Sequence, residues 1–146
     1  MKRLSILLMS VAILALGSCK LTKSVSASDS AAVMSGKQCA IASNSLYNTY
    51  KSTGKLDLSN NTNVTNILTV ITSYNQLKEN KNNTSYRKAF AKGAASAGTQ
   101  LITSANSERF IDALLNCTAL NGVTAQNIQQ KAQTASTIIT LFNALN

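Results

Sequence analysis

The 146-residue chain contains no histidine, no tryptophan and no proline, and only five acidic side chains. The absence of histidine removes the commonest general base and the commonest ligand for transition metals. The five acids show none of the spacing of a calcium-binding loop. They are Asp29, Asp57, Glu79, Glu108 and Asp112. We therefore expect no catalytic residue, no metal ion and no cofactor.

The lack of proline also bears on the fold. Without proline and with six glycines, a chain rich in Ala, Leu, Ile, Asn, Ser and Thr favours helices. The sequence predicts an all-α protein, with about five helices in a compact up-and-down bundle.

The first residues carry the pattern of an export signal. Lys2 and Arg3 are followed by a largely apolar run over residues 4–16. These features are typical of a secretory signal peptide. A transmembrane helix needs about 20 apolar residues, and this run is shorter, with Lys20 close behind it.

The run ends in Leu16-Gly17-Ser18-Cys19. These residues resemble the lipobox of bacterial lipoproteins, in which an aliphatic residue and two small residues precede a cysteine. The resemblance covers residues 1–19 and implies that the Cys19 thiol receives a diacylglycerol, that the signal is cleaved before it, and that its amino group is acylated, for example with palmitate. Several acyl chains anchor a protein stably where one does not. An ordinary cleaved signal peptide is the alternative.

The domain organisation follows from this signal. Residues 1–18 are the expected signal peptide, residues 19–30 the lipidated cysteine with a tether rich in Ser and Lys, and residues 31–146 the helical domain. Cleavage removes two of the 14 basic residues and leaves 12 against 5 acids. The mature chain is therefore strongly basic.

The residues after Cys19 bear on its location. Surface-exported lipoproteins of the Bacteroidota carry acidic residues just after the lipidated cysteine, whereas this chain has Lys20 to Lys23 with none. An aspartate directly after the cysteine, which marks inner-membrane retention in enterobacteria, is also absent. The resemblance implies the outer membrane, facing the periplasm, with the cell surface as the alternative.

Cys39 and Cys117 remain once Cys19 is lipidated. An even pair in an oxidising compartment predicts a disulfide. It would close a loop of about 79 residues and stabilise the fold by roughly 4 to 5 kcal/mol in the chain-entropy model. The alternative is two small buried side chains that never meet.

Apolar residues at helical spacing predict five helices. The first helix is expected over 31–52, with Asp29 as its cap, and the second over 62–78, with cap candidates among 60–63. The third is expected to run from its cap, Thr84 or Ser85, to Leu101. The fourth is expected to run from its cap, Asn106 or Ser107, to Gly122, and the fifth from its cap, Thr124, to Leu145. The segment 66–74 has β-branched residues, but its spacing of 3 and 4 favours a helix. Small residues over 93–98 predict a close crossing with a neighbouring helix, with a kink in the helix as the alternative.

A basic cluster lies around the third helix. Its members are Lys78, Lys81, Arg87, Lys88 and Lys92. Tyr86 and Phe90 lie among them, which would suit a polyanion, or belong to the core while the cations keep the helix soluble. Anionic lipids or glycans of the envelope are the expected partners of such a patch, and nucleic acid is not expected.

Three functions can be compared on this basis. The first is a non-enzymatic envelope lipoprotein acting as a structural or binding module, similar to small lipoproteins of Gram-negative bacteria. The second is an accessory or inhibitory subunit for an envelope protein, which predicts an exposed apolar patch on the small-residue face of the third helix. The third is an enzyme, which would need a pocket that gathers two acids, such as Glu108 and Asp112 at a spacing of four.

Overall fold

The structure is a computed structural model that describes residues 27–131 and 133–145. Over these residues the chain forms five α-helices, one short 3₁₀ helix and no strand, which confirms the all-α prediction. The helices are α1 (Ala27–Thr53), α2 (Asn61–Glu79), α3 (Thr84–Ser96), α4 (Ser107–Leu115), η2 (Thr118–Leu120) and α5 (Gln133–Asn143).

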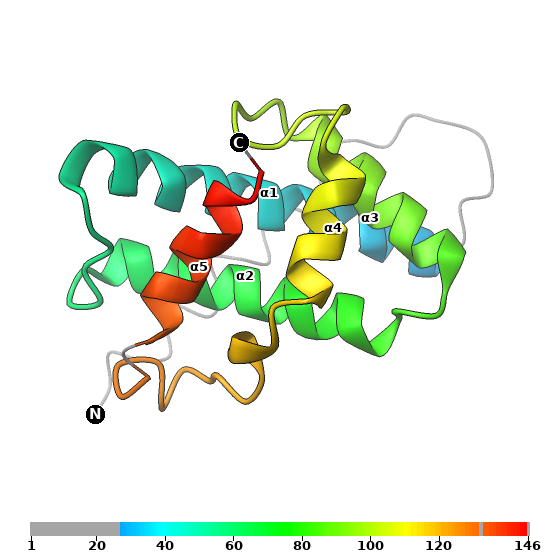
Figure 1. Ribbon diagram of the computed structural model, residues 1–146. Helices are drawn as coiled ribbons and strands as arrows, with labels where there is room; N and C mark the ends of the chain where they lie inside the picture. The colour runs from blue at the N-terminus through cyan, green and yellow to red at the C-terminus, as the bar shows by residue number, and fades with distance from the viewer. Residues whose placement is uncertain (1–26, 132, 146) are drawn as a thin grey trace, which may run out of the picture.

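The first three helices run up, down and up. Ser73 Oγ of α2 donates to the Ser35 carbonyl of α1 (3.4 Å), and Asn66 Nδ2 donates to Ser45 Oγ (3.0 Å), so α2 is antiparallel to α1. On the other side of α1, Ser85 Oγ at the start of α3 donates to the Asp29 carboxylate (3.1 Å). Helices α4 and α5 each cross in front of the α1–α2 pair, with a space between them (Figure 1).

Helix starts are set by asparagines. The Asn60 side chain accepts from the backbone N–H groups of Thr62 (2.9 Å) and Asn63 (3.3 Å), which confirms a cap among residues 60–63. Asn83 caps α3 by accepting from Tyr86 N–H (3.1 Å), one residue before the predicted Thr84. Helix α1 already includes Ala27, so Asp29 lies in its first turn and does not cap it.

Helix ends differ more from the prediction. Helix α3 ends at Ser96, shortly before Gly98 with its φ of 66°, and α4 ends at Leu115 instead of Gly122. Helix α5 begins at Gln133, nine residues after the predicted cap Thr124. The Asn127 side chain explains this delay, because it accepts from Thr124 N–H (2.8 Å) and donates to the Gly122 carbonyl (2.8 Å). Such bonds hold a turn that competes with a helix.

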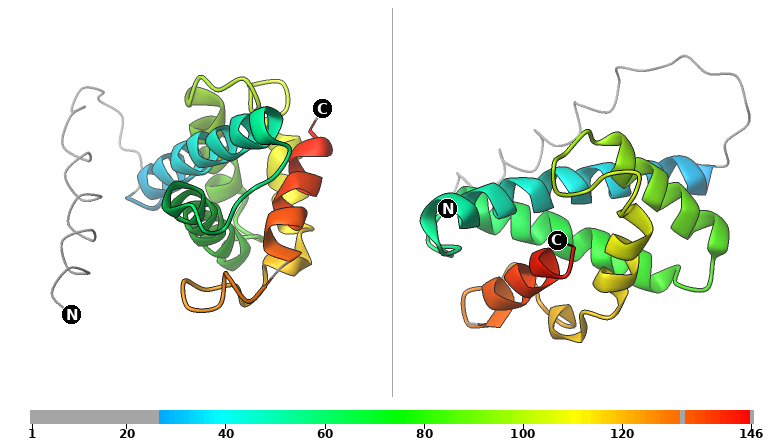
Figure 2. Two further views of the ribbon diagram at one scale, coloured as in Figure 1. Left: turned by 90° about the vertical axis from the view of Figure 1, so that its left-hand side faces the viewer. Right: turned by 45° about the horizontal axis from the view of Figure 1, so that its top comes forward.

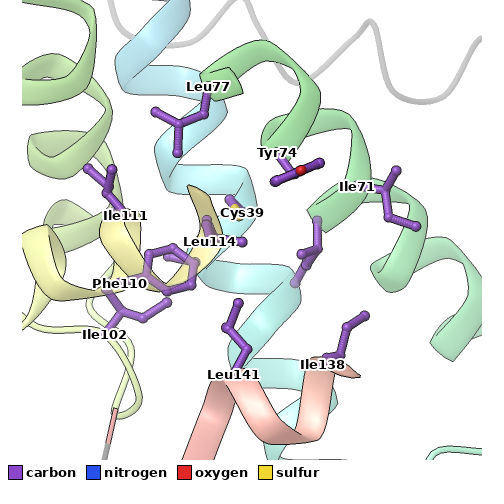
Figure 3. Packing of buried hydrophobic residues seen from close by; sticks show 14 of the residues in the cluster. Cys39, Ile71, Tyr74, Leu77, Ile102, Phe110, Ile111, Leu114, Ile138 and Leu141 are labelled. Atoms are coloured by element: carbon purple, nitrogen blue, oxygen red, sulfur yellow. The ribbon is translucent and has the colours of Figure 1, made fainter. Parts of the chain in front are cut away.

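One apolar core joins all the helices. Phe90, Phe110 and Phe142 are fully buried, and the Tyr47 ring meets the Phe142 ring edge to face with centroids 5.9 Å apart. Figure 3 shows side chains of α1, α2, α4 and α5 converging on one centre. In α2 the apolar residues at helical spacing, such as Ile67, Ile71 and Tyr74, are buried, whereas in α1 Tyr47 and Tyr50 are only partly buried.

Helices α1 and α3 touch backbone to backbone. A Cβ atom built on Gly93 would lie 2.0 Å from the Val33 carbonyl oxygen, and one built on Gly36 would lie 2.0 Å from the Phe90 carbonyl oxygen. Only glycine at both positions permits this approach. The predicted close crossing is therefore present, and its partner glycine, Gly36, lies in α1.

Candidate binding groove between α3 and α4

A groove lies between α3 and α4. It consists of two open hollows, of about 200 and 500 Å³, that share Lys88, Ala91 and Glu108. The smaller hollow also has Thr84, Arg87, Ile111 and Asp112 in its lining, and the larger has Lys92, Ala95, Ser96, Ser104 and Ser107. We call this feature the α3–α4 groove. Small residues at its base and charged residues along its rims suit it to a polar or charged ligand.

The rims carry opposite charges. Arg87 of α3 and Asp112 of α4 form a salt bridge of 2.9 Å at the smaller hollow, and both side chains are well exposed. It is the only salt bridge among the residues that the structure describes. Lys88 and Lys92 therefore have no carboxylate within salt-bridge distance, and they are the cations of the groove that a ligand could pair with.

The start of α4 adds hydroxyl groups to the larger hollow. Asn106 occupies the cap position but makes no side-chain cap bond, because its amide instead accepts from Thr103 N–H (2.8 Å) and donates to the Leu101 carbonyl (3.0 Å). The buried Ser107 and the exposed Ser104 line the hollow beside Lys92. A helix start favours negative charge, although Glu108 in the first turn already supplies one.

The structure divides the predicted basic patch. Arg87, Lys88 and Lys92 line the groove, whereas Lys81 lies exposed in the turn between α2 and α3. Lys78 is engaged elsewhere: its Nζ donates to Asn121 Oδ1 (2.6 Å) and lies 5.9 Å from the centroid of the Tyr74 ring. A cluster that is continuous in sequence thus presents only part of its charge to the groove.

The aromatic residues of that cluster do not reach its surface. Phe90 is fully buried and Tyr86 nearly so. Neither ring can stack on a base, which removes the feature that would have suited a nucleic acid. The alternative reading, in which both rings belong to the core, is confirmed.

Glu108 and Asp112 do meet in the smaller hollow. They come from successive turns of one helix, and both are exposed. Asp112 is paired with Arg87. The groove thus brings together two acids, as the enzyme hypothesis requires, and one of them is engaged in a salt bridge.

The small-residue stretch of α3 is covered in part. Gly93 and Ala94 are buried, and Gly93 lies against α1. This part of the surface expected to bind a partner as an accessory or inhibitory subunit is thus used inside the fold, whereas Ala95 and Ser96 line the larger hollow. The sequence analysis did not identify Gly36 as the partner of Gly93. The available signal was its place in the middle of a predicted helix, where glycine costs about 1 kcal/mol of helix stability relative to alanine.

The structure does not confirm the disulfide predicted between Cys39 and Cys117. Both residues have free thiols in the structure. Cys39 is fully buried in the middle of α1, and this burial raises its pKa to about 12, against the opposing effect of the Ser73 and Ser43 hydroxyls. Cys117 is half-buried after the end of α4, beyond the helix that was expected to carry it. An oxidising compartment and an even number of cysteines favour a disulfide. A disulfide also requires the two Cβ atoms to lie about 3.8 Å apart, and neither feature of the sequence specifies that distance.

Cys19 and the signal peptide lie outside the described residues, which begin at residue 27. Within 27–131 and 133–145, no helix is both long and apolar enough to cross a membrane. Over the same ranges, no three Cys, Asp or Glu side chains come together as a metal site would need.

Comparisons with protein families, with curated proteins and with solved structures found no match to this chain.

Proposed function

We propose that this chain is a lipid-anchored protein of the bacterial cell envelope, with a helical domain that acts as a non-enzymatic binding module. The observation that carries the proposal is the sequence Leu16-Gly17-Ser18-Cys19 after a basic and then apolar leader. Only a thiol at this position can take the lipid. The absence of acids directly after Cys19 supports the outer membrane, facing the periplasm, over the cell surface.

The anchor is tested by substitution of Cys19. In cells that carry a lipoprotein pathway, we expect the natural chain in the membrane fraction, with an acylated Cys19 as its first residue. Cys19→Ser removes the lipidated atom, so the membrane-bound share should fall at least about tenfold, since the acyl chains supply the binding energy. Fractionation and mass spectrometry of the N-terminus measure both results.

Cys117→Ser is the matched control, because it removes a thiol from the helical domain and leaves the signal intact. It should fractionate as the natural chain does. A natural chain that begins with an unmodified Met1 would contradict the proposal.

The α3–α4 groove is the binding site that the proposal assigns to the domain. Lys88 and Lys92 lack carboxylate partners and lie beside the serines at the start of α4, which supports an anionic ligand such as a lipid or glycan of the envelope. The basic character of the mature chain favours the same class of ligand.

A double substitution tests the groove. Lys88→Ala with Lys92→Ala should weaken binding to immobilised lipopolysaccharide by at least about tenfold at low salt, because each cation near an anionic surface contributes about 1 kcal/mol. Lys55→Ala with Lys81→Ala removes the same charge from exposed positions outside the groove and should change binding less than about threefold. Surface plasmon resonance gives both affinities. Equal losses in the two variants would mean that net charge, and not the groove, binds the ligand.

A further inference from the structure

The outward face of α1 carries two exposed apolar side chains. Met34 and Ile41 are 45% and 49% exposed, and they are the exposed large hydrophobic residues of the described chain. Seven residues apart, they lie on the same side of the helix, two turns from each other. This side is opposite to Gly36 and Cys39, which face the interior.

The residues around this pair are uncharged or basic. Lys37 is exposed and lies between Met34 and Ile41 on the same side, next to Gln38. Asp29 is the one acid of α1, and it is engaged with Ser85 at the start of α3. No carboxylate of α1 thus opposes the approach of an anionic surface to this face.

The length of chain before α1 limits how far this face can be from a membrane. Helix α1 includes Ala27, four residues before the predicted start at residue 31. Only seven residues therefore separate Cys19 from the helix. Seven residues span at most about 25 Å. Met34 and Ile41 lie about 10 and 21 Å along the helix from its start. An anchor at Cys19 therefore holds both side chains within reach of the bilayer, with Lys20 and Lys23 in the connecting segment.

From these observations we infer that α1 lies along the membrane surface, with Met34 and Ile41 in the boundary between head groups and acyl chains and Lys37 at the lipid phosphates. The inference rests on the proposed lipid anchor. Apolar side chains at this depth, flanked by lysine, are how a helix lies in the interface. This orientation turns the segment 121–131 away from the membrane, because that segment lies on the side of the domain opposite to α1 (Figure 2).

Tryptophan fluorescence can test this orientation cleanly, because the natural chain has no tryptophan. Met34→Trp and Ile41→Trp place a single probe on the α1 face, and Gln129→Trp places it at an exposed position on the opposite side. Each variant is purified with its lipid, checked by mass spectrometry at Cys19, and inserted into vesicles of phosphatidylethanolamine and phosphatidylglycerol. Brominated acyl chains then report contact with the bilayer.

We expect brominated lipid to quench the probes at positions 34 and 41 at least about threefold more strongly than the probe at position 129. Their emission should also shift to the blue, since an indole prefers the interface. Adding Lys37→Glu to the Met34→Trp variant should reduce the quenching. Equal, weak quenching at all three positions in a lipidated protein would overturn the inference and leave the anchor standing.

Two other outcomes are distinguishable. A blue shift at positions 34 and 41 without quenching by brominated lipid would mean that another protein surface, such as a second copy, covers the face, and would also overturn the inference. A protein without lipid at Cys19 would be recognised by its mass before any fluorescence is read, and would refute the proposed function itself.

Discussion

Gly93→Ala should destabilise the domain by about 3 kcal/mol. The added Cβ would lie 2.0 Å from the Val33 carbonyl oxygen, and because the atom it meets is backbone, no side-chain rotation can relieve the overlap. Helices α1 and α3 would have to separate, which loosens the packing around the buried Phe90. Such a loss is a large part of the stability of a domain of this size. Urea unfolding followed by circular dichroism measures it.

The direction of the stability change at Gly93 distinguishes a close crossing from an isolated helix. In a helix without a close neighbour, Gly→Ala stabilises by about 1 kcal/mol, since alanine is the better helix former. A Gly93→Ala variant more stable than the natural chain would therefore show that α1 and α3 do not touch at this point.

Gly54→Ala serves as the control. Gly54 has a φ of 73° and open space around its Cβ position, so alanine there meets no atom and suffers backbone strain alone. We expect it to cost about 1 kcal/mol. Gly36→Ala should resemble Gly93→Ala, because its Cβ would meet the Phe90 carbonyl from the other side of the same crossing.

Stability should fall steeply in alkaline solution, and Cys39 is the largest single cause that we identify. Burial raises the pKa of its thiol from 9.0 to about 12. Between these values the unfolded chain loses the thiol proton while the native chain keeps it, so the unfolded state binds fewer protons and stability decreases as pH rises. The slope is about 1 kcal/mol for each pH unit between 9 and 12, and it vanishes well below pH 9, where the thiol keeps its proton in both states.

Other groups add to this trend in the same direction. Burial also raises the pKa of Tyr74, Tyr86 and Cys117. The part due to Cys39 is isolated by Cys39→Ala, which should lower stability at neutral pH because it leaves a small cavity, yet flatten the decline above pH 9. Urea unfolding at a series of pH values, in the presence of a reductant, gives both slopes.

Cys117→Ala is the matched control for this titration. Cys117 is only half-buried, so its removal should change the slope much less than Cys39→Ala does. Thiol labelling offers an independent check, since Cys117 should react in the native protein and Cys39 only after unfolding. Identical slopes for the natural chain and Cys39→Ala would show that the thiol is not buried as the structure has it.

Several features of the fold could be predicted from the sequence because they depend on local pattern. Apolar residues at spacings of 3 and 4 made 61–79 a helix within one residue at either end, and Asn60 was among the expected caps. The small residues around Gly93 indicated a close crossing, because a helix without large side chains makes few contacts unless a neighbouring backbone comes near. The predicted helix boundaries were wrong where a side chain forms hydrogen bonds with nearby backbone, as Asn127 does in the turn before α5.

The groove and the cysteines show where pattern is insufficient. The sequence presents Lys78 and Lys88 as one basic cluster, but helix directions send Lys78 to Asn121 and Lys88 to the α3–α4 groove. Ser104 and Ser107 enter the groove because the start of α4 lies beside the end of α3. Distances between such segments depend on how the helices pack, which no short stretch of sequence specifies.

The sequence by itself determined the helical class, the basic character of the chain and the pattern Leu16-Gly17-Ser18-Cys19 from which we propose the anchor, because each depends on residue type and on spacing along one segment. Only the tertiary structure decided which helices touch, that Gly36 is the partner of Gly93, that Cys39 is buried while Cys117 is half-buried, and that Met34 and Ile41 point outward. These outcomes depend on the relative placement of helices distant in sequence, which is set by the fit of whole faces in one core.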